Sequence, residues 1–477
     1  MMLTREINRL VTAVFIIFGI ITLAAAYWAT IGPGTILERE DNPRLVEAEA
    51  AIRRGGIFDR SGDQLAISVV DENNRVTREY FYPETSSILG YSSLRYGVSG
   101  AESAYNPIIR GDNAEQSVVE QLLQNALHQP QVGSDIQLSL DLQIQQALQA
   151  SMDGYVGAAV VLAVPSGEVL GLISLPTFDP NTLDQNWELL VASADKPFFN
   201  RVLQGQYQPG GTLETPLMAL ALATDSNLLA STTANATAPV TINDLTITCA
   251  LRLPALELSL RDAYAFACPA PFVQLTQDLP EQSVQDSLRF FSTSNRVTLP
   301  GFESAPLNPP VNLPAGVEPH SLAEVALGQA QLTVTPLQMA VMAAGIINDG
   351  NAPQPRALLA TRPPDASNWT PNQTTYPTIP FTTEQTARQL QDLMRNTVVN
   401  GAALNAARPG IDIGGHVTLS YSGDETQSWF IGFATLPGRR GIATAVIIEN
   451  NDDPGLAADI GGTILAAAHD ELIQAAR

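Results

Sequence analysis

An uncharged apolar run near the N-terminus is the strongest hydrophobic pattern in the chain. It covers residues 11–31, VTAVFIIFGIITLAAAYWATI, and as a helix it would be about 31 Å long, close to the roughly 30 Å of a bilayer core. Arg5 and Arg9 precede the run, and Tyr27 and Trp28 lie near its far end, as is typical of a membrane interface. We therefore expect a cytoplasmic N-terminus, one membrane-spanning helix and an extracytoplasmic remainder.

A cleaved signal peptide is the alternative interpretation of this run. Ala24, Ala25 and Ala26 offer a small-residue cleavage site. The apolar run is longer than the about 7–15 residues usual for the core of a signal peptide, so the pattern favours an anchor.

Short apolar runs broken by turn residues follow the anchor. Turn signals such as Ser61-Gly62-Asp63 punctuate residues 35–132, which predicts an irregular, strand-containing module. After Asp135, strand-like alternation gives way to a helical pattern that ends near Met152. We therefore expect a cytoplasmic tail, an anchor, an N-terminal strand-containing domain and a large second domain, with the bounds 1–10, 11–31, 32–134 and 135–477.

Two hairpins are predicted in the second domain. Apolar runs at 158–164 and 169–174 flank the turn residues Pro165-Ser166-Gly167. Much later, apolar runs at 429–434 and 442–449 flank Pro437-Gly438.

Helical patterns fill most of the sequence between these hairpins. One helix is predicted to have Thr335 as its N-cap, Pro336 as its first residue and Gly350 as its C-terminal stop. Another apolar-faced helix is predicted over residues 457–476. Hairpins at both ends of a domain with helices between them predict an α+β fold, with one antiparallel sheet covered by helices.

Composition narrows the function classes. The 477 residues are 45% hydrophobic and only 15% charged, which excludes a disordered chain. A net charge of −23 makes nucleic acid an improbable partner. The two cysteines and four histidines lack metal-ligand spacing, so we expect no metal and no cofactor. Of 25 basic residues only Lys196 is a lysine.

The segments RRGGIFDRSGDQLAIS, ILGYSSLRYGVSGAESAYNPIIRG, SLDLQIQQAL, PSGEVLGLISLPTFDPN, NRVLQGQYQPGGT, GQAQLTVTPLQMA and SWFIGFA occur in this order. Together they resemble the class B penicillin-binding proteins. The resemblance implies a membrane-anchored protein of peptidoglycan synthesis, with a pedestal and a transpeptidase domain of the serine β-lactamase-like fold. Family members acylate a serine with a D-Ala-D-Ala end, and β-lactams trap that serine. Their chemistry rests on the motifs SxxK, SxN and KTG. The segments are 53–68, 88–111, 139–148, 165–181, 200–212, 328–340 and 428–434.

The first motif is degenerate. Where the family has the serine and the lysine of SxxK, this chain has Gly211-Thr212-Leu213-Glu214, so both the nucleophile and its base are missing. Pro216 is tolerated only in the first turn of a helix, so we expect the helix to start near Leu213 or later, with Gly211 outside it. Thr212 is expected as a helix-start residue rather than a nucleophile.

The second motif is expected at Ala267-Cys268-Pro269, where both polar residues of SxN are gone. Cys268 is expected as a buried structural thiol. A disulfide from Cys268 to Cys249 is the alternative in an oxidising compartment.

The third motif is expected just before residues 428–434. There Tyr421 replaces the lysine of KTG, and Ser422 and Gly423 stand for the threonine and the glycine. Asp424 and Glu425 follow, and their charge would repel the carboxylate that family substrates present near this strand.

A literal SxxK does occur at Ser193-Ala194-Asp195-Lys196. Lys196 precedes a proline, which disfavours helical geometry there, and the match falls upstream of the expected position. We interpret it as a surface loop. Because the family mechanism needs two lysines, no shift of the alignment restores it.

These observations predict a catalytically inactive member of the family that serves the cell-wall machinery of shape or division as a scaffold or regulator. The resemblance implies a polytopic glycan polymerase as partner, contacted through residues 11–31 and 35–132, and peptidoglycan as a further ligand. Two alternatives remain open. One is an active, penicillin-sensitive transpeptidase with unconventional residues, and the other is a module that senses muropeptides reversibly in the old cleft.

Overall fold

The computed structural model divides the chain into two compact units. One comprises residues 1–53, 69–77 and 114–132, and the other comprises 54–68, 78–113 and 133–477. The structure describes residues 2–30, 47, 49–72, 75–112, 130–242, 244–291, 297–306, 319–329, 332–423, 425–438 and 440–475.

The N-terminal helix α1 runs from Met2 to Thr30. Within it, Arg9–Tyr27 has a mean hydropathy of 2.4, and none of this stretch is buried against the rest of the chain. In the part of the chain that the structure describes, α1 is the one helix long and apolar enough to cross a membrane. It fits a single-pass anchor.

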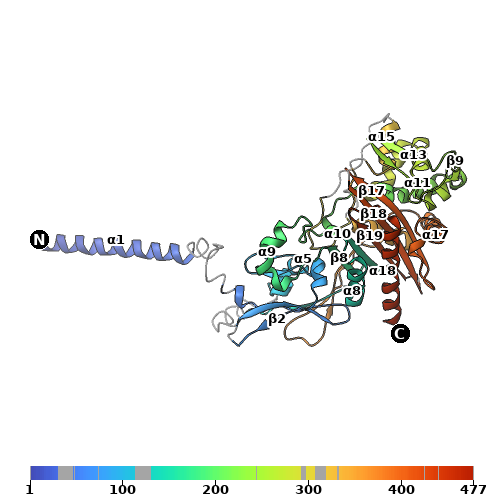
Figure 1. Ribbon diagram of the computed structural model, residues 1–477. Coiled ribbons are helices and arrows are strands. Elements are labelled where there is room, and N and C mark those ends of the chain that lie inside the picture. The colour runs from blue at the N-terminus through green and yellow to red at the C-terminus, as the bar shows by residue number, and fades with distance from the viewer. Residues whose placement is uncertain are drawn as a thin grey trace. The chain divides into compact units, whose positions relative to one another are not determined.

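A five-stranded antiparallel sheet forms the centre of the larger unit (Figure 1). Its strand order is β17-β18-β19-β7-β8. The β7–β8 and β18–β19 hairpins are the two predicted from the sequence, so both predictions are confirmed. The strands are β7 (Gly157–Val164), β8 (Val169–Leu175), β17 (Ile413–Ser422), β18 (Glu425–Leu436) and β19 (Arg440–Ile448).

Helices cover both faces of this sheet, which confirms the predicted α+β architecture. On one face, α8 (Leu142–Met152) and α18 (Pro454–Gln474) pack against side chains such as Phe430. On the other face, α16 (Pro336–Ile347) packs against side chains such as Trp429. Strand alternation explains this division, because neighbouring residues of β18 point to opposite faces.

Helix α16 shows why the sequence signals at its ends were reliable. The Thr335 hydroxyl accepts the Gln338 N–H, and the Gln338 side chain accepts the Thr335 N–H, which completes a capping box. Pro336 is the first helical residue. The helix ends at Ile347, and Gly350 with φ of 88° lies in the turn that follows.

A second sheet joins residues far apart in the sequence. Its six strands lie in the order β15-β14-β6-β1-β2-β3. The sheet combines β6 and β14 from the predicted second domain with β1, β2 and β3 from the predicted pedestal. It therefore does not mark a boundary between the two domains, and the boundary at 134/135 stays a prediction. The strands are β1 (Ile57–Phe58), β2 (Gln64–Val70), β3 (Val76–Tyr80), β6 (Asp135–Leu138), β14 (Leu358–Arg362) and β15 (Thr370–Pro371).

A buried carboxylate holds three segments of the pedestal together. Glu102 is inaccessible to solvent, and its two oxygens pair with Arg54 at 2.8 Å and with Arg78 at 2.6 Å. Burial alone raises the pKa of Glu102, but the two guanidinium groups outweigh it and leave the pKa below its usual value. A carboxylate with two charged donors is a stable arrangement only while all three groups are present.

The remaining elements are short or peripheral to the two sheets. The helices are α4 (Ser86–Leu89), α5 (Gly100–Ala104), α6 (Asn106–Arg110), α9 (Leu183–Ala192), α10 (Arg201–Gln204), α11 (Glu214–Thr224), α12 (Leu260–Ala265), α13 (Pro269–Asp278), α14 (Glu281–Ser287), α15 (Pro319–Ala326) and α17 (Glu384–Asn400). The small strands are β4 (Ser92–Ser93), β5 (Gly97–Val98), β9 (Thr232–Thr233), β10 (Val240–Ile242), β11 (Leu245–Ile247), β12 (Leu258–Ser259), β13 (Asn351–Ala352) and β16 (Ile379–Pro380).

Candidate functional site

The first degenerate motif forms a tight turn against strand β17. Residues Gly210–Leu213 make a single 3₁₀ turn, and helix α11 begins at Glu214. Gly211 therefore lies outside the α-helix, as Pro216 in the first helical turn predicts. Gly210 has a φ of 55°, and a Cβ on it would overlap the backbone of Leu419. The turn can approach the strand this closely only because residue 210 is a glycine.

The second degenerate motif lies at the start of helix α13. Ala267 has a φ of 49°, Cys268 is the N-cap, and Pro269 is the first helical residue. Cys268 is fully buried and forms a disulfide with Cys249, 19 residues earlier in the chain. The bridge that the sequence left as an alternative is therefore the arrangement in the structure.

These two motifs meet strand β17 around one small hollow. Its volume is about 10 Å³, which is at the lower limit for one water molecule. Strand β17 contributes Thr418 and Leu419, whereas Tyr421, Ser422 and Gly423 do not line the hollow. The lining residues are Gly211, Glu214, Ile247, Thr248, Ala250, Ala267, Pro269, Leu327, Thr418 and Leu419.

The residues expected to form the third motif lie instead at the end of strand β17. Tyr421 packs against an apolar cluster that includes Ile242 and Ala323. Ser422 is exposed and pairs with Glu425, and Gly423 with φ of 61° lies in the hairpin turn. Asp424 lies outside the described residues. Glu425 is exposed at the start of β18, so it does not share the hollow with Glu214.

Thr418 occupies the space that a side chain at position 211 would need. A Cβ on Gly211 would overlap the Oγ1 atom of Thr418 and would lie 3.3 Å from Oε1 of Glu214. Thr418 is buried, and its hydroxyl donates to the Leu419 carbonyl at 3.2 Å. The hollow therefore has no room for a nucleophile at 211 unless Thr418 moves.

Glu214 faces His416 on strand β17. The His416 Nε2 atom lies 3.2 Å from Oε2 of Glu214, and both side chains are at least 96% buried. Tyr264 stacks on the His416 ring at 4.3 Å and 3°, and its hydroxyl lies 3.0 Å from the Thr215 hydroxyl. Burial raises the pKa of Glu214, and contact with His416 opposes this shift only in part.

Neither of the two facing atoms has another partner. Oε2 of Glu214 and Nε2 of His416 make no hydrogen bond to any other group in the described part of the chain. Burying two such groups is costly unless they interact with each other. The contact between Glu214 and His416 is therefore what offsets the cost of burying them.

Sequence reasoning missed His416 and Thr418, although a signal for them was present. In the segment GGHVTLSYS, the polar residues His416, Thr418 and Ser420 recur at every second position of a strand. They pair with Ile431, Trp429 and Gln427 of β18, and paired residues share a face of the sheet.

The two other candidate groups, Thr212 and Lys196, do not line this hollow. Thr212 is fully buried, and its hydroxyl donates to the Pro209 carbonyl at 2.6 Å. Lys196 is exposed in the loop after α9 and is not among the lining residues. Within the described residues no three His, Cys, Asp or Glu side chains gather as metal ligands.

Comparisons with protein families agree with the fold. The family model "Penicillin binding protein transpeptidase domain" matches residues 157–468. The model "Penicillin binding protein A dimerisation domain" matches residues 54–136.

Individual relatives cover most of the chain. The peptidoglycan D,D-transpeptidase PbpA of Mycobacterium tuberculosis is 28% identical over 461 residues, which cover 90% of this chain and 91% of the relative. The peptidoglycan D,D-transpeptidase MrdA of Acinetobacter baumannii is 26% identical over 411 residues, which cover 76% of this chain and 59% of the relative.

Solved structures show the same similarity. The crystal structure of PBPA from M. tuberculosis has a TM-score of 0.76 at 26% identity, covering 88% of this chain and 99% of that one. Its ceftriaxone acyl-enzyme complex has a TM-score of 0.77 at 25% identity, covering 89% of this chain and all of that one.

Proposed function

The chain belongs to the class B penicillin-binding proteins, the peptidoglycan transpeptidase family, and we propose that it serves cell-wall synthesis as a non-enzymatic scaffold or regulator. The observation that carries this proposal is that Thr418 occupies the space that a side chain on residue 211 would need, beside the buried contact between Glu214 and His416.

The hollow is filled by a reciprocal exchange of side chains. We propose that residues 416–418, rather than Tyr421-Ser422-Gly423, take the places of K-T-G, because His416 faces Glu214 across a 3.2 Å contact. Thr418 then stands where the family has glycine, and Gly211 stands where it has serine.

The two positions assigned to the family's motif lysines also support a lack of catalysis. Acyl transfer in this family uses a lysine base beside the serine, and here a buried glutamate faces a buried histidine instead. A buried carboxylate whose pKa is raised does not replace an ammonium group that recognises a substrate carboxylate.

The volume of the hollow argues against reversible muropeptide sensing at this place. Peptide-sized ligands need cavities of roughly 300 Å³ or more, and the hollow has about 10 Å³. The hollow is therefore too small for a site that senses muropeptides.

Penicillin labelling tests the absence of catalysis. The detergent-solubilised chain is incubated with a fluorescent penicillin beside the mycobacterial PbpA as positive control, then analysed by denaturing gel and intact mass. We expect an adduct on the control only. An adduct on this chain, including one mapped to the Thr418 hydroxyl, would support the alternative of an unconventional active enzyme.

The membrane role is a proposal that rests on α1 and the family. We propose that the N-terminus is cytoplasmic, that the bulk is extracytoplasmic, and that α1 and the pedestal contact a polytopic glycan polymerase. Cross-linking and co-purification of the full chain would recover this polymerase. A matched variant whose residues 11–31 are replaced by an unrelated membrane span should lose it, and equal recovery by both proteins would contradict a role for α1.

A further inference from the structure

A larger cavity lies away from the hollow and shares no lining residue with it. Its volume is about 260 Å³, and its walls come from α4, α5, the end of β8, the loop before α10 and the turn at Gly301–Glu303. This volume is below the about 300–1,000 Å³ of sites for drug-sized ligands and suits a group of the size of one amino-acid side chain.

Hydrogen bonds among its inner polar groups fix the shape of the cavity. The Ser87 hydroxyl donates to the Ser174 carbonyl and accepts the Ser174 N–H, at 3.1 and 3.0 Å. The Asn200 amide donates to the Ser87 carbonyl at 2.7 Å, and the Ser99 hydroxyl accepts the Tyr91 N–H at 3.2 Å. The site is therefore formed before any ligand arrives.

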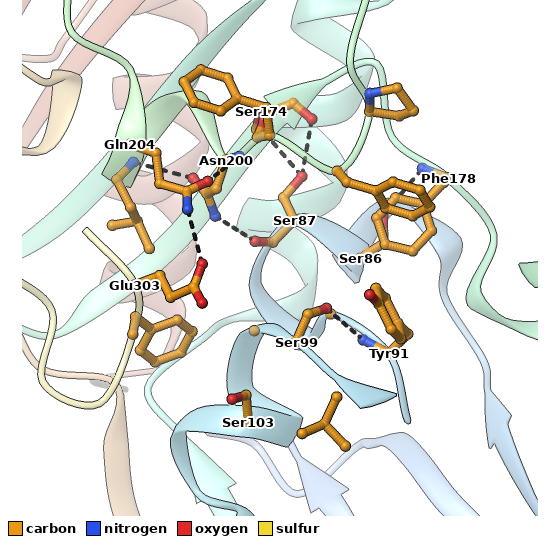
Figure 2. A pocket seen from close by; sticks show the side chains of 18 of the residues that line it. Ser86, Ser87, Tyr91, Ser99, Ser103, Ser174, Phe178, Asn200, Gln204 and Glu303 are labelled. Atoms are coloured by element: carbon orange, nitrogen blue, oxygen red, sulfur yellow. Dashed lines mark hydrogen bonds between the residues drawn. The ribbon is translucent and has the colours of Figure 1, made fainter. Parts of the chain in front are cut away.

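Three groups around the same cavity retain hydrogen-bonding capacity (Figure 2). Among the described residues, the Tyr91 and Ser103 hydroxyls have no side-chain hydrogen-bond partner, and Glu303 accepts one bond, from Gln204 at 3.1 Å. Burial and the Glu303 carboxylate raise the pKa of Tyr91, so its phenol stays neutral at physiological pH.

The charge of the cavity selects the ligand class. No Lys, Arg or His is among the described lining residues, and Glu303 supplies one negative charge. The rings of Tyr91, Phe178 and Phe198 form an edge-to-face cluster with centroids 4.9–6.1 Å apart. Aromatic rings beside a carboxylate attract an organic cation and disfavour an anion.

We propose that this cavity binds a primary alkylammonium group, with Glu303 accepting the charged hydrogen bond, the Tyr91 and Ser103 hydroxyls completing its shell, and the aromatic cluster contacting its alkyl stem. The ammonium group belongs to a lysine-like side chain of a peptide or to a free diamine. These sources share the chemistry, and the experiment separates them.

Isothermal titration calorimetry of the solubilised full chain tests this proposal directly. The probes are Nα-acetyl-L-lysine amide for the peptide source and 1,5-diaminopentane for the free amine. Nα-acetyl-L-norleucine amide, which has a similar alkyl stem without the amine, is the matched control ligand. We expect saturable binding of at least one amine, weakened by added salt, and no binding of the norleucine amide.

Two variants assign the site. Glu303→Gln should weaken amine binding about 10-fold or more, the loss expected for a charge-assisted hydrogen bond, and Tyr91→Phe should weaken it a few-fold. Glu257→Gln makes the same chemical change at another exposed position and should bind as the wild type does. Because Glu303 is exposed, its variant should keep the wild-type melting temperature.

Three results would overturn the proposal: no amine binding, equal binding of the norleucine amide, or unchanged binding by Glu303→Gln. Binding of N-acetylglucosamine without binding of an amine would assign the cavity to a neutral sugar and also refute it. None of these outcomes bears on penicillin labelling, so this inference and the proposed lack of catalysis can fail separately.

Discussion

The exchange between Gly211 and Thr418 predicts a strong energetic coupling between these two positions. Gly211→Ser adds a hydroxymethyl group to a hollow of about 10 Å³, which is at the lower limit for one water molecule, and its Cβ would overlap Oγ1 of Thr418. Overpacking of this kind typically costs about 1–3 kcal/mol. Thr418→Gly alone leaves a void and loosens the strand, which also destabilises.

The double variant Gly211→Ser/Thr418→Gly should be more stable than the sum of the single effects predicts. The new serine side chain enters the space that the threonine leaves, so we expect a coupling of about 1–2 kcal/mol. For a cooperative unit of about 400 residues, 1 kcal/mol shifts the melting temperature by about 1 °C. Differential scanning calorimetry of the four proteins measures this coupling.

Thr426→Gly is the matched control, because it makes the same change on β18 at a position that does not line the hollow. Its effect should add to that of Gly211→Ser without coupling. Additive effects for the Gly211→Ser and Thr418→Gly pair would refute the overlap on which our reasoning rests. On the proposed lack of catalysis, the double variant should still not react with penicillin, because Glu214 and His416 are unchanged and neither is a lysine.

Three further predictions concern charge and the disulfide. Glu102→Gln should destabilise the fold by about 3–5 kcal/mol, because it leaves two buried guanidinium groups with no carboxylate, and thermal melting measures this. Because the pKa of Glu102 is lowered, its contribution to stability is present above the unfolded-state pKa of about 4.3 and is lost as pH falls below it. The pKa of Glu214 is raised. The contribution of Glu214 to folding stability is therefore fully present below pH about 4.3 and is lost as pH rises through the folded-state pKa. Glu214→Gln should remove this pH dependence from the melting temperature. Replacing Cys268 with serine should cost about 3 kcal/mol, by the chain-entropy estimate for a loop of this length, which calorimetry of the variant checks.

Each of these measurements has a control. Exposed Glu257→Gln should leave both the stability and the pH profile unchanged, and reduction of the wild type should reproduce the Cys268 variant. A wild-type melting temperature in Glu102→Gln would contradict the role given to the buried carboxylate. A pH profile of Glu214→Gln that matches the wild type would contradict the cost of its burial.

Local signals in the sequence were sufficient for the regular elements. The hairpin turns, the capping box at Thr335 and the helix start imposed by Pro216 depend only on residues close together in the chain, so their prediction needs no tertiary information. The membrane span is predictable for the same reason.

Predicting the candidate site requires knowledge of how strands pair, which local sequence signals do not contain. The third motif was expected immediately before Trp429, but β17 and β18 form a tight hairpin, and the residue that pairs with Trp429 is Thr418. Residues just before Trp429 in sequence lie at the hairpin end, away from the hollow. The charge network of Glu102 and the larger cavity likewise bring together segments far apart in the chain, which no local pattern reveals.

If the proposed lack of catalysis holds, the overlap between position 211 and Thr418 makes a return to the family motif a change of several steps. A single codon change that restores serine at 211 meets an occupied space and no lysine at 214, so it brings cost without benefit. Selection would remove such a revertant before the other three positions could follow. On the proposed scaffold role, recovery of catalysis would need several substitutions at once, whereas further changes to a scaffold would not.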